Sequence, residues 1–130
     1  MKRRVVITGI GVVSPVGLNV KDYWNSLITG VSGVGPITKF DSAEFDTHFA
    51  AELKGFDPLN YMDRKLSQRV DPFTQYALAA SEEAVNDAAF DMEKLDKDRV
   101  GVVYGSGIGG MWTYDTQQKN LFKRDGNPDR

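Results

Sequence analysis

A glycine cluster is the feature of this sequence whose residue types and spacing could bind a ligand. A G-x-G-x-x-G pattern runs from Gly105 to Gly110 after an apolar run, and Asp125 lies twenty residues beyond its first glycine. In dinucleotide-binding proteins such glycines let the backbone approach a pyrophosphate, and the acidic residue binds the ribose. That site also requires a helix that starts at the third glycine and a second strand that ends in the acidic residue. The mostly polar residues after Gly110 predict neither of them.

Two other interpretations of these glycines are open. They can form a tight turn that needs bare backbone, or the bare backbone can let a substrate or another subunit approach closely. Ile108 is the only bulky residue among the glycines. In the second interpretation the Ile108 side chain would project from the loop.

The sequence offers no other group suited to catalysis. It contains no cysteine, which excludes a thiolate nucleophile, a thiolate metal site and a disulfide within these residues. His48 is the only histidine and lies in no cluster of ligands, so we assign it no role and expect no metal site. Ser106 lacks the spacing of a nucleophile elbow, and no P-loop lysine follows a glycine cluster. We therefore expect no catalytic residue and no cofactor in this segment.

A small basic group could bind an anionic partner. It consists of Arg64, Lys65 and Arg69. If residues 61–70 are helical, Lys65 and Arg69 are four positions apart and share a face. The alternative is a solvated face that is partly neutralised by neighbouring aspartates. The whole chain has 16 Lys and Arg against 18 Asp and Glu, and this balance argues against nucleic acid as the partner.

Two short apolar runs predict the strands that would position these groups. Residues 5–7 and 99–104 are rich in β-branched side chains, as expected of parallel strands buried on both faces. Gly9 and Gly11 predict a turn after the first strand. The order strand, helix, long helix, strand favours an α/β layered architecture. Because two strands are too few for a stable parallel sheet, we expect the chain to be a fragment.

Two helices are predicted between these strands. The first covers about ten residues, is capped by Asn19 and ends at Gly30. The second starts with Asp71 as its cap and runs to about Ala89. The seven acidic residues from Glu82 to Asp98 predict a solvated surface without function, and residues 31–60 predict an irregular, partly packed segment. Small side chains at helical spacing would let another backbone approach the second helix: Phe73 is followed by Ala77, Ala80, Ala84 and Ala88.

Composition and the amino terminus point to a cytoplasmic globular protein. Hydrophobic residues make up 41% and charged residues 26% of the 130 residues, which is typical of about one globular domain. The first residues lack the apolar stretch of a signal peptide. No apolar run approaches the roughly 20 residues of a membrane span, so we expect no membrane partner.

Several motifs occur in the order found in a known enzyme family. They read VVITGIGVVSPVG at residues 5–17, DPFTQYA at residues 71–77 and GSGIGG at residues 105–110. With these motifs the chain resembles the β-ketoacyl-[acyl carrier protein] synthases, the condensing enzymes of fatty acid synthesis. The resemblance covers essentially the whole chain.

The resemblance implies a thiolase-like fold of five αβαβα layers. Residues 1–130 would be part of the family's amino-terminal domain and form an incomplete amino-terminal half of that fold. The implied homodimeric enzyme elongates acyl chains by decarboxylative Claisen condensation of an acyl-enzyme with malonyl-[acyl carrier protein]. Family members place the nucleophilic Cys, two His and a Lys after this segment, so we expect the segment alone to be inactive. The alternatives are a non-catalytic chain-length factor of the same fold and a dinucleotide-binding module.

The resemblance also implies roles for individual residues. Ile108, with Gly107 beside it, corresponds to the acyl-chain pocket near the subunit interface, where it helps decide the chain length admitted. Arg64, Lys65 and Arg69 fall where the family has basic residues that meet the acidic acyl carrier protein. Gln68 stands at a position that is basic in some members, which predicts a weaker or differently shaped basic surface here.

Overall fold

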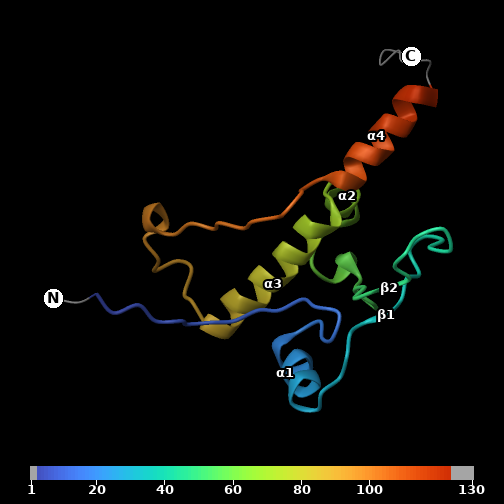
Figure 1. The fold of residues 1–130 in the computed structure, drawn as a ribbon. Helices are drawn as coiled ribbons and strands as arrows, with labels where there is room; N and C mark the ends of the chain where they lie inside the picture. Colours follow the sequence, from blue (N-terminus) through green and yellow to red (C-terminus); the bar gives the residue numbers. More distant parts are fainter. Residues whose placement is uncertain (1–2, 124–130) are drawn as a thin grey trace.

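The computed structural model describes residues 3–123 and shows an open arrangement of helices around the long helix α3 (Figure 1). No helix within these residues combines the length and the apolar composition that a membrane-spanning helix needs. The helices are α1 (Val20–Ile28), α2 (Arg64–Ser67), α3 (Pro72–Ala88) and α4 (Met111–Lys123), and the two short strands are β1 (Gly35–Pro36) and β2 (Phe49–Ala50). Two 3-10 turns cover Pro58–Asn60 and Lys97–Arg99.

A close contact between the amino-terminal segment and α3 organises this arrangement. A Cβ atom built on Gly11 would overlap the Ala80 carbonyl oxygen and lie 2.8 Å from the Ala84 nitrogen, and one built on Gly9 would lie 2.6 Å from the Ala88 nitrogen. Two backbones can approach so closely only because glycines face alanines. The predicted approach of a backbone to the alanine face is confirmed. The predicted turn at these glycines is wrong, because the chain runs on across α3 (Figure 1) and turns only at residues 14–17, where Ser14 and Gly17 exchange backbone hydrogen bonds.

Two carboxylates of α3 bind the backbone of the amino-terminal segment. Glu83 accepts the N–H groups of Val12 and Val20, both at 2.8 Å, and Asp87 accepts the N–H group of Ile10 at 2.9 Å. In a β-sheet, carbonyl groups of a neighbouring strand would accept these N–H groups. Here the two carboxylates accept them instead. Asp87 is exposed, as predicted for this surface, whereas Glu83 is half-buried, and both carboxylates are structural acceptors.

Helix α1 has both of its predicted ends. The Asn19 side-chain oxygen accepts the Asp22 N–H group at 2.9 Å, and Gly30 has a φ of 69°. The N–H groups of Gly30 and Val31 donate back to carbonyl groups in the last turn at 3.2 and 2.9 Å. This is the Schellman arrangement, which satisfies carbonyl groups that the helix end leaves free.

Residues 31–60 are largely irregular, as predicted, and pack locally. β1 and β2 pair antiparallel with Gly35 opposite Ala50. The Phe56 ring lies against the rings of Tyr61 and Tyr76, with centroid distances of 5.5 and 5.0 Å. Since Tyr76 belongs to α3, these aromatic contacts fix the end of the irregular segment on the long helix.

The two predicted strands are not strands in this structure. Residues 5–7 and 99–104 have no ladder partner within residues 3–123. Their side chains are exposed instead of buried, to 92% for Val5 and 99% for Val103. A strand exists through hydrogen bonds to a neighbour, which β-branched side chains cannot supply by themselves.

The described residues form an open arrangement rather than a closed core. The accessible surface is 10987 Å², whereas a compact protein of 14.4 kDa has about 6,800 Å². Ala79 is the only apolar residue of the described chain that is buried, at 2% exposure. Large apolar side chains therefore remain uncovered on several faces.

Replacing a glycine at the contact with α3 should destabilise the protein. In Gly11→Ala the new Cβ overlaps the Ala80 carbonyl oxygen and pushes the two segments apart. We expect the free energy of unfolding, measured by urea denaturation, to fall by about 1–3 kcal/mol, as for other overpacked sites. Gly35→Ala is the matched control, because a Cβ there would meet only the Lys54 amino group, at 3.7 Å. Equal stability of the two variants would contradict the close contact.

Candidate functional site

The glycine loop and the basic group meet at the start of α3. One Asp71 carboxylate oxygen accepts the Thr113 N–H group at 3.0 Å, and the other would lie 2.6 Å from a Cβ built on Gly110. Arg69 lies two residues before Asp71, and Ile108 lies two residues before Gly110. Two residues span at most about 7 Å, so Arg69 and Ile108 lie within roughly 20 Å of each other. The structure thus brings both candidate groups to one corner.

The basic group is exposed but less helical than predicted. α2 covers only Arg64–Ser67, so the condition that residues 61–70 are helical is not met, and Arg69 lies beyond the helix. The helix cannot continue into α3, because a residue before proline avoids helical backbone. Arg64, Lys65 and Arg69 are all exposed, and no ion pair found within residues 3–123 involves them. The alternative of a solvated face fits this exposure, although no aspartate makes an ion pair with these side chains within residues 3–123.

Side chains on both sides hold α2 in place. Asp63 caps its start by accepting the Leu66 N–H group at 2.8 Å. Gln75 of α3 donates its side-chain amide to the Ser67 carbonyl at 2.8 Å. Gln68, at the position that is basic in some β-ketoacyl synthases, is the exposed last residue of the turn. The basic side chains therefore extend from a fixed backbone into solvent.

A helix starts where the sequence predicts none. α4 begins directly after the last glycine of the loop. The signal that sequence analysis missed is the pair Asp115 and Lys119, which bond at 2.7 Å at the i, i+4 spacing of a helix. Within the loop, Ser106 accepts the Gly109 N–H group at 3.2 Å, and Gly109 has a φ of 79°. This turn needs glycine because other residues rarely adopt that backbone conformation.

The new helix does not make the loop a dinucleotide site. A pyrophosphate would accept the free N–H groups at the start of α4. The Asp71 carboxylate already accepts one of them, from Thr113, and its charge would repel a phosphate. No strand precedes the glycines within the part of the chain that the structure describes, and Asp125 lies outside it. The geometry therefore argues against the dinucleotide interpretation.

Ile108 projects from the loop. Its side chain is 80% exposed. A Cβ built on the neighbouring Gly107 would have no contact within 4 Å, so no contact inside the described chain requires glycine there. An exposed apolar side chain on bare backbone can make contact with an apolar ligand or a second subunit.

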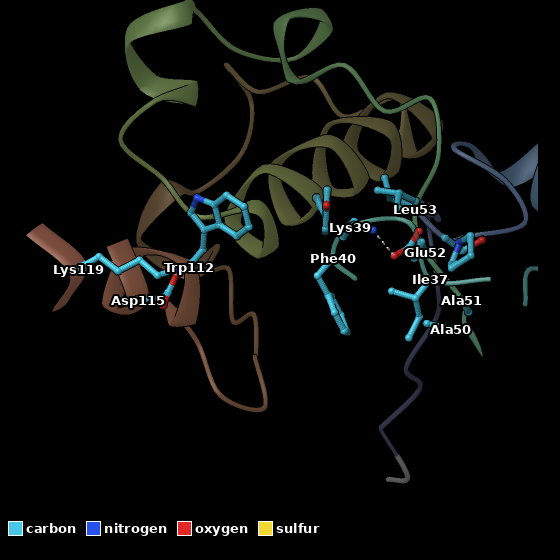
Figure 2. Close-up of a pocket in the computed structure, with 14 residues that line it drawn as sticks. Ile37, Lys39, Phe40, Ala50, Ala51, Glu52, Leu53, Trp112, Asp115 and Lys119 are labelled. Carbon is cyan, nitrogen blue, oxygen red and sulfur yellow. Dashed lines mark hydrogen bonds and ion pairs between the residues drawn. The ribbon is translucent and has the colours of Figure 1, made fainter. Parts of the chain in front are cut away.

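A groove beside this corner was missed by sequence analysis. It has a volume of about 760 Å³, within the range of small-molecule sites. Figure 2 shows Trp112 of α4 on one side and Phe40 and Glu52 of the irregular segment on the other. The sequence gives little signal for it, since its lining comes from five separate stretches of the chain.

Glu52 is the one buried charged residue within residues 3–123, at 8% exposure. Its carboxylate accepts the Thr38 hydroxyl group at 2.6 Å and the N–H groups of Thr38 and Lys39 at 3.1 and 3.2 Å. These bonds, first the one from the Thr38 hydroxyl, hold the pKa of the Glu52 carboxyl below its usual value. Glu52 thereby ties residues 38 and 39 to the chain after β2 and fixes one wall of the groove.

Comparison with known proteins identifies similar sequences. The family model described as "Beta-ketoacyl synthase, N-terminal domain" matches residues 2–129. The 3-oxoacyl-[acyl-carrier-protein] synthase 2 of Synechocystis sp. is 42% identical over 123 residues, which cover 95% of this chain and 30% of that protein. The enzyme of the same name from Staphylococcus aureus strain COL is 45% identical over 122 residues, with 94% and 30% covered. The chain thus spans less than a third of the length of these curated relatives.

Solved structures of ketosynthases are also similar to this chain. The ishigamide ketosynthase/chain length factor matches with a TM-score of 0.77 and 31% identity over 99% of this chain and 32% of its own. A type II PKS acyl-carrier protein in complex with its ketosynthase bound to the hexaketide matches with a TM-score of 0.75 and 27% identity over 97% of this chain and 33% of its own. The described elements therefore have the arrangement of part of a ketosynthase fold.

Lowering the pH should open the wall of the groove. Because the folded pKa of Glu52 is depressed, its stabilising effect is complete above the ordinary glutamate pKa and is lost as the pH falls through the lower folded value. We expect the hydrogen-exchange protection of the Thr38 and Lys39 amides to fall over that range. Glu52→Gln should abolish this pH dependence, and Glu44→Gln, at an exposed site in the same segment, should keep it. Constant protection in the unmodified protein would refute the role of Glu52.

Proposed function

The chain belongs to the β-ketoacyl synthase family, and on this premise we propose that it is the amino-terminal part of a condensing enzyme of fatty acid biosynthesis. The observation that carries the proposal is the match of residues 2–129 to the amino-terminal domain of the family. In the proposed reaction an acyl group is held as a thioester on the enzyme. Malonyl-[acyl carrier protein] loses carbon dioxide, and its carbanion attacks the thioester carbonyl and releases the enzyme thiolate.

We assign this segment to binding rather than to bond making. The reaction requires a thiolate with a lowered pKa and N–H donors for the developing oxyanion. The 130 residues contain no cysteine, so the nucleophile would be supplied by another part of the protein. The isolated segment would then be inactive.

We place residues 1–130 in the amino-terminal domain of a thiolase-like αβαβα fold. The TM-score of 0.77 to a ketosynthase/chain length factor supports this placement. It also explains the exposed apolar side chains of residues 5–7 and 99–104, which would become buried when neighbouring strands pair with them. The alanine face of α3 would lie between layers, where small side chains allow close packing.

We propose acyl carrier protein as the partner of the basic group. Arg64, Lys65 and Arg69 extend from a fixed turn into solvent, as an electrostatic docking site for an acidic partner requires. One of the similar structures is a type II PKS acyl-carrier protein in complex with its ketosynthase. That complex supports the choice of partner, and we assign the docking to Arg64, Lys65 and Arg69.

We propose that Ile108 and Gly107 border the acyl-chain pocket of a cytoplasmic homodimer. The exposure of Ile108 leaves its side chain free to contact the end of an acyl chain or the second subunit. The substrates would be acyl and malonyl thioesters. A bulky side chain at this position would limit the length of the acyl chain admitted.

A chain-length factor is the second candidate. It is favoured by the 31% identity to the ishigamide ketosynthase/chain length factor. Such a subunit would share the fold but lack the reacting cysteine. The two candidates therefore differ in one feature, which lies outside this segment. A condensing enzyme has the reacting cysteine there, and a chain-length factor does not.

Acyl transfer to the protein separates the two candidates. We expect the full-length protein, incubated with radiolabelled acyl-[acyl carrier protein], to gain label on a cysteine, and malonyl-[acyl carrier protein] to convert that label into a 3-oxoacyl product. Prior alkylation with iodoacetamide should block the labelling and serves as the control. A folded protein that gains no label would be a chain-length factor and would overturn the enzyme assignment.

Charge reversal should weaken docking of the carrier protein. Lys65→Glu replaces attraction by repulsion, so we expect the KM for acyl-[acyl carrier protein] to rise about five-fold or more with little change in kcat, and the effect to shrink with added salt. Lys21→Glu, at an exposed position on α1, is the matched control and should keep the KM. An unchanged KM for Lys65→Glu at moderate salt would exclude this docking site.

A further inference from the structure

We propose that Asp71 is a positioning residue that holds the glycine loop, residues 105–110, in a fixed relation to the basic group, residues 64–69. The inference rests on the proposed function, in which the loop borders the acyl pocket and the basic group docks the carrier protein. The first observation is that Asp71 does not do what its place in the sequence predicts. It lies at the start of α3, yet its side chain makes no capping bond to that helix.

The Asp71 carboxylate caps α4 instead. Thr113 is the third residue of α4, and its N–H group is one of those that have no partner inside the helix. Asp71 accepts this N–H group at 3.0 Å across 42 residues, as the side chain of an N-cap residue would. The residue before α4 is Gly110, which has no side chain to do so. The cap is therefore also a tether between α3 and α4.

Gly110 and Asp71 are matched in shape. A Cβ built on Gly110 would lie 2.6 Å from a carboxylate oxygen of Asp71. Gly110 does not have a positive φ, so its backbone conformation would accept any residue. A side chain at position 110 would therefore have to move the Asp71 carboxylate from its present place. A capping side chain at position 110 would displace the Asp71 carboxylate. The chain instead has glycine at position 110 and uses the Asp71 carboxylate as the cap of α4.

The other side of the tether is rigid. The Asp71 carbonyl accepts the N–H groups of Thr74 and Gln75 at 2.9 and 3.2 Å. The Gln75 side chain in turn donates to the Ser67 carbonyl at the end of α2 at 2.8 Å. Asp71 is thus fixed to the turn that carries the basic group. Loss of its carboxylate would free the glycine loop and leave the basic group where it is, so the carboxylate sets the position of Ile108 relative to the docking site.

Three variants of the full-length protein test this inference. We expect Asp71→Ala to raise the exchange rate of the amides in residues 107–116 about ten-fold, as for loss of a helix cap. We expect the ratio of kcat/KM for a long over a short acyl-[acyl carrier protein] to change by about three-fold or more, because the pocket wall is no longer fixed. Asp71→Asn keeps an oxygen that accepts the Thr113 N–H group, so it should resemble the unmodified protein in both readouts.

The double variant Asp71→Ala with Gly110→Ser separates capping from tethering. Serine at position 110 supplies a local cap, so the exchange rate should return to its normal value while the chain-length ratio stays changed. Recovery of both would show a merely structural cap and overturn the inference, as would an Asp71→Ala protein with normal exchange or a normal ratio. If the unmodified protein does not condense acyl chains, the proposed function fails, and normal exchange in Asp71→Ala alone would then refute the tether.

Discussion

The packing of bare backbone on the alanine face of α3 is the constraint on which the described structure depends. Gly9 and Gly11 lie so close to α3 that any side chain on them would overlap its backbone. At this separation, the N–H groups of the crossing segment come within reach of Glu83 and Asp87. A larger residue on either surface would separate the two segments and break these bonds together. The two glycines therefore secure polar contacts in which they take no part themselves.

The same helix also positions both candidate binding groups. Asp71 at its start holds the loop that carries Ile108, and Gln75 one turn later holds the end of α2. In each case one side chain of α3 bonds to a backbone group of another segment. α3 is thus the common frame of the site, although it contributes none of the groups proposed to touch a ligand or partner.

Most features with local causes could be predicted from the sequence, whereas most features with distant partners could not, the exceptions being the missed α4 and the predicted approach of a backbone to the alanine face of α3. The caps of α1 depend on residues within the helix or beside it, so Asn19 and Gly30 were predicted correctly. Residues 5–7 carry the composition of a strand, but the neighbour that would pair with them is not among the described residues. The cap of α4 lies 42 residues away, and the bonds of Glu52 span 13 and 14 residues. The basic group and Ile108 were identified by their residue types, whereas their common corner required the three-dimensional structure.

Hydrogen bonds, which are polar contacts, hold α2, α3 and α4 together at the corner of the candidate site. Large apolar faces of the described chain are exposed, so apolar packing alone does not fix the corner between α2, α3 and α4. Hydrogen bonds from side chains to backbone do so, and their geometry is directional where apolar contact is not. All of these bonds lie within residues 3–123. In this structure the hydrogen bonds that relate the basic group to the glycine loop are thus made within the described residues themselves.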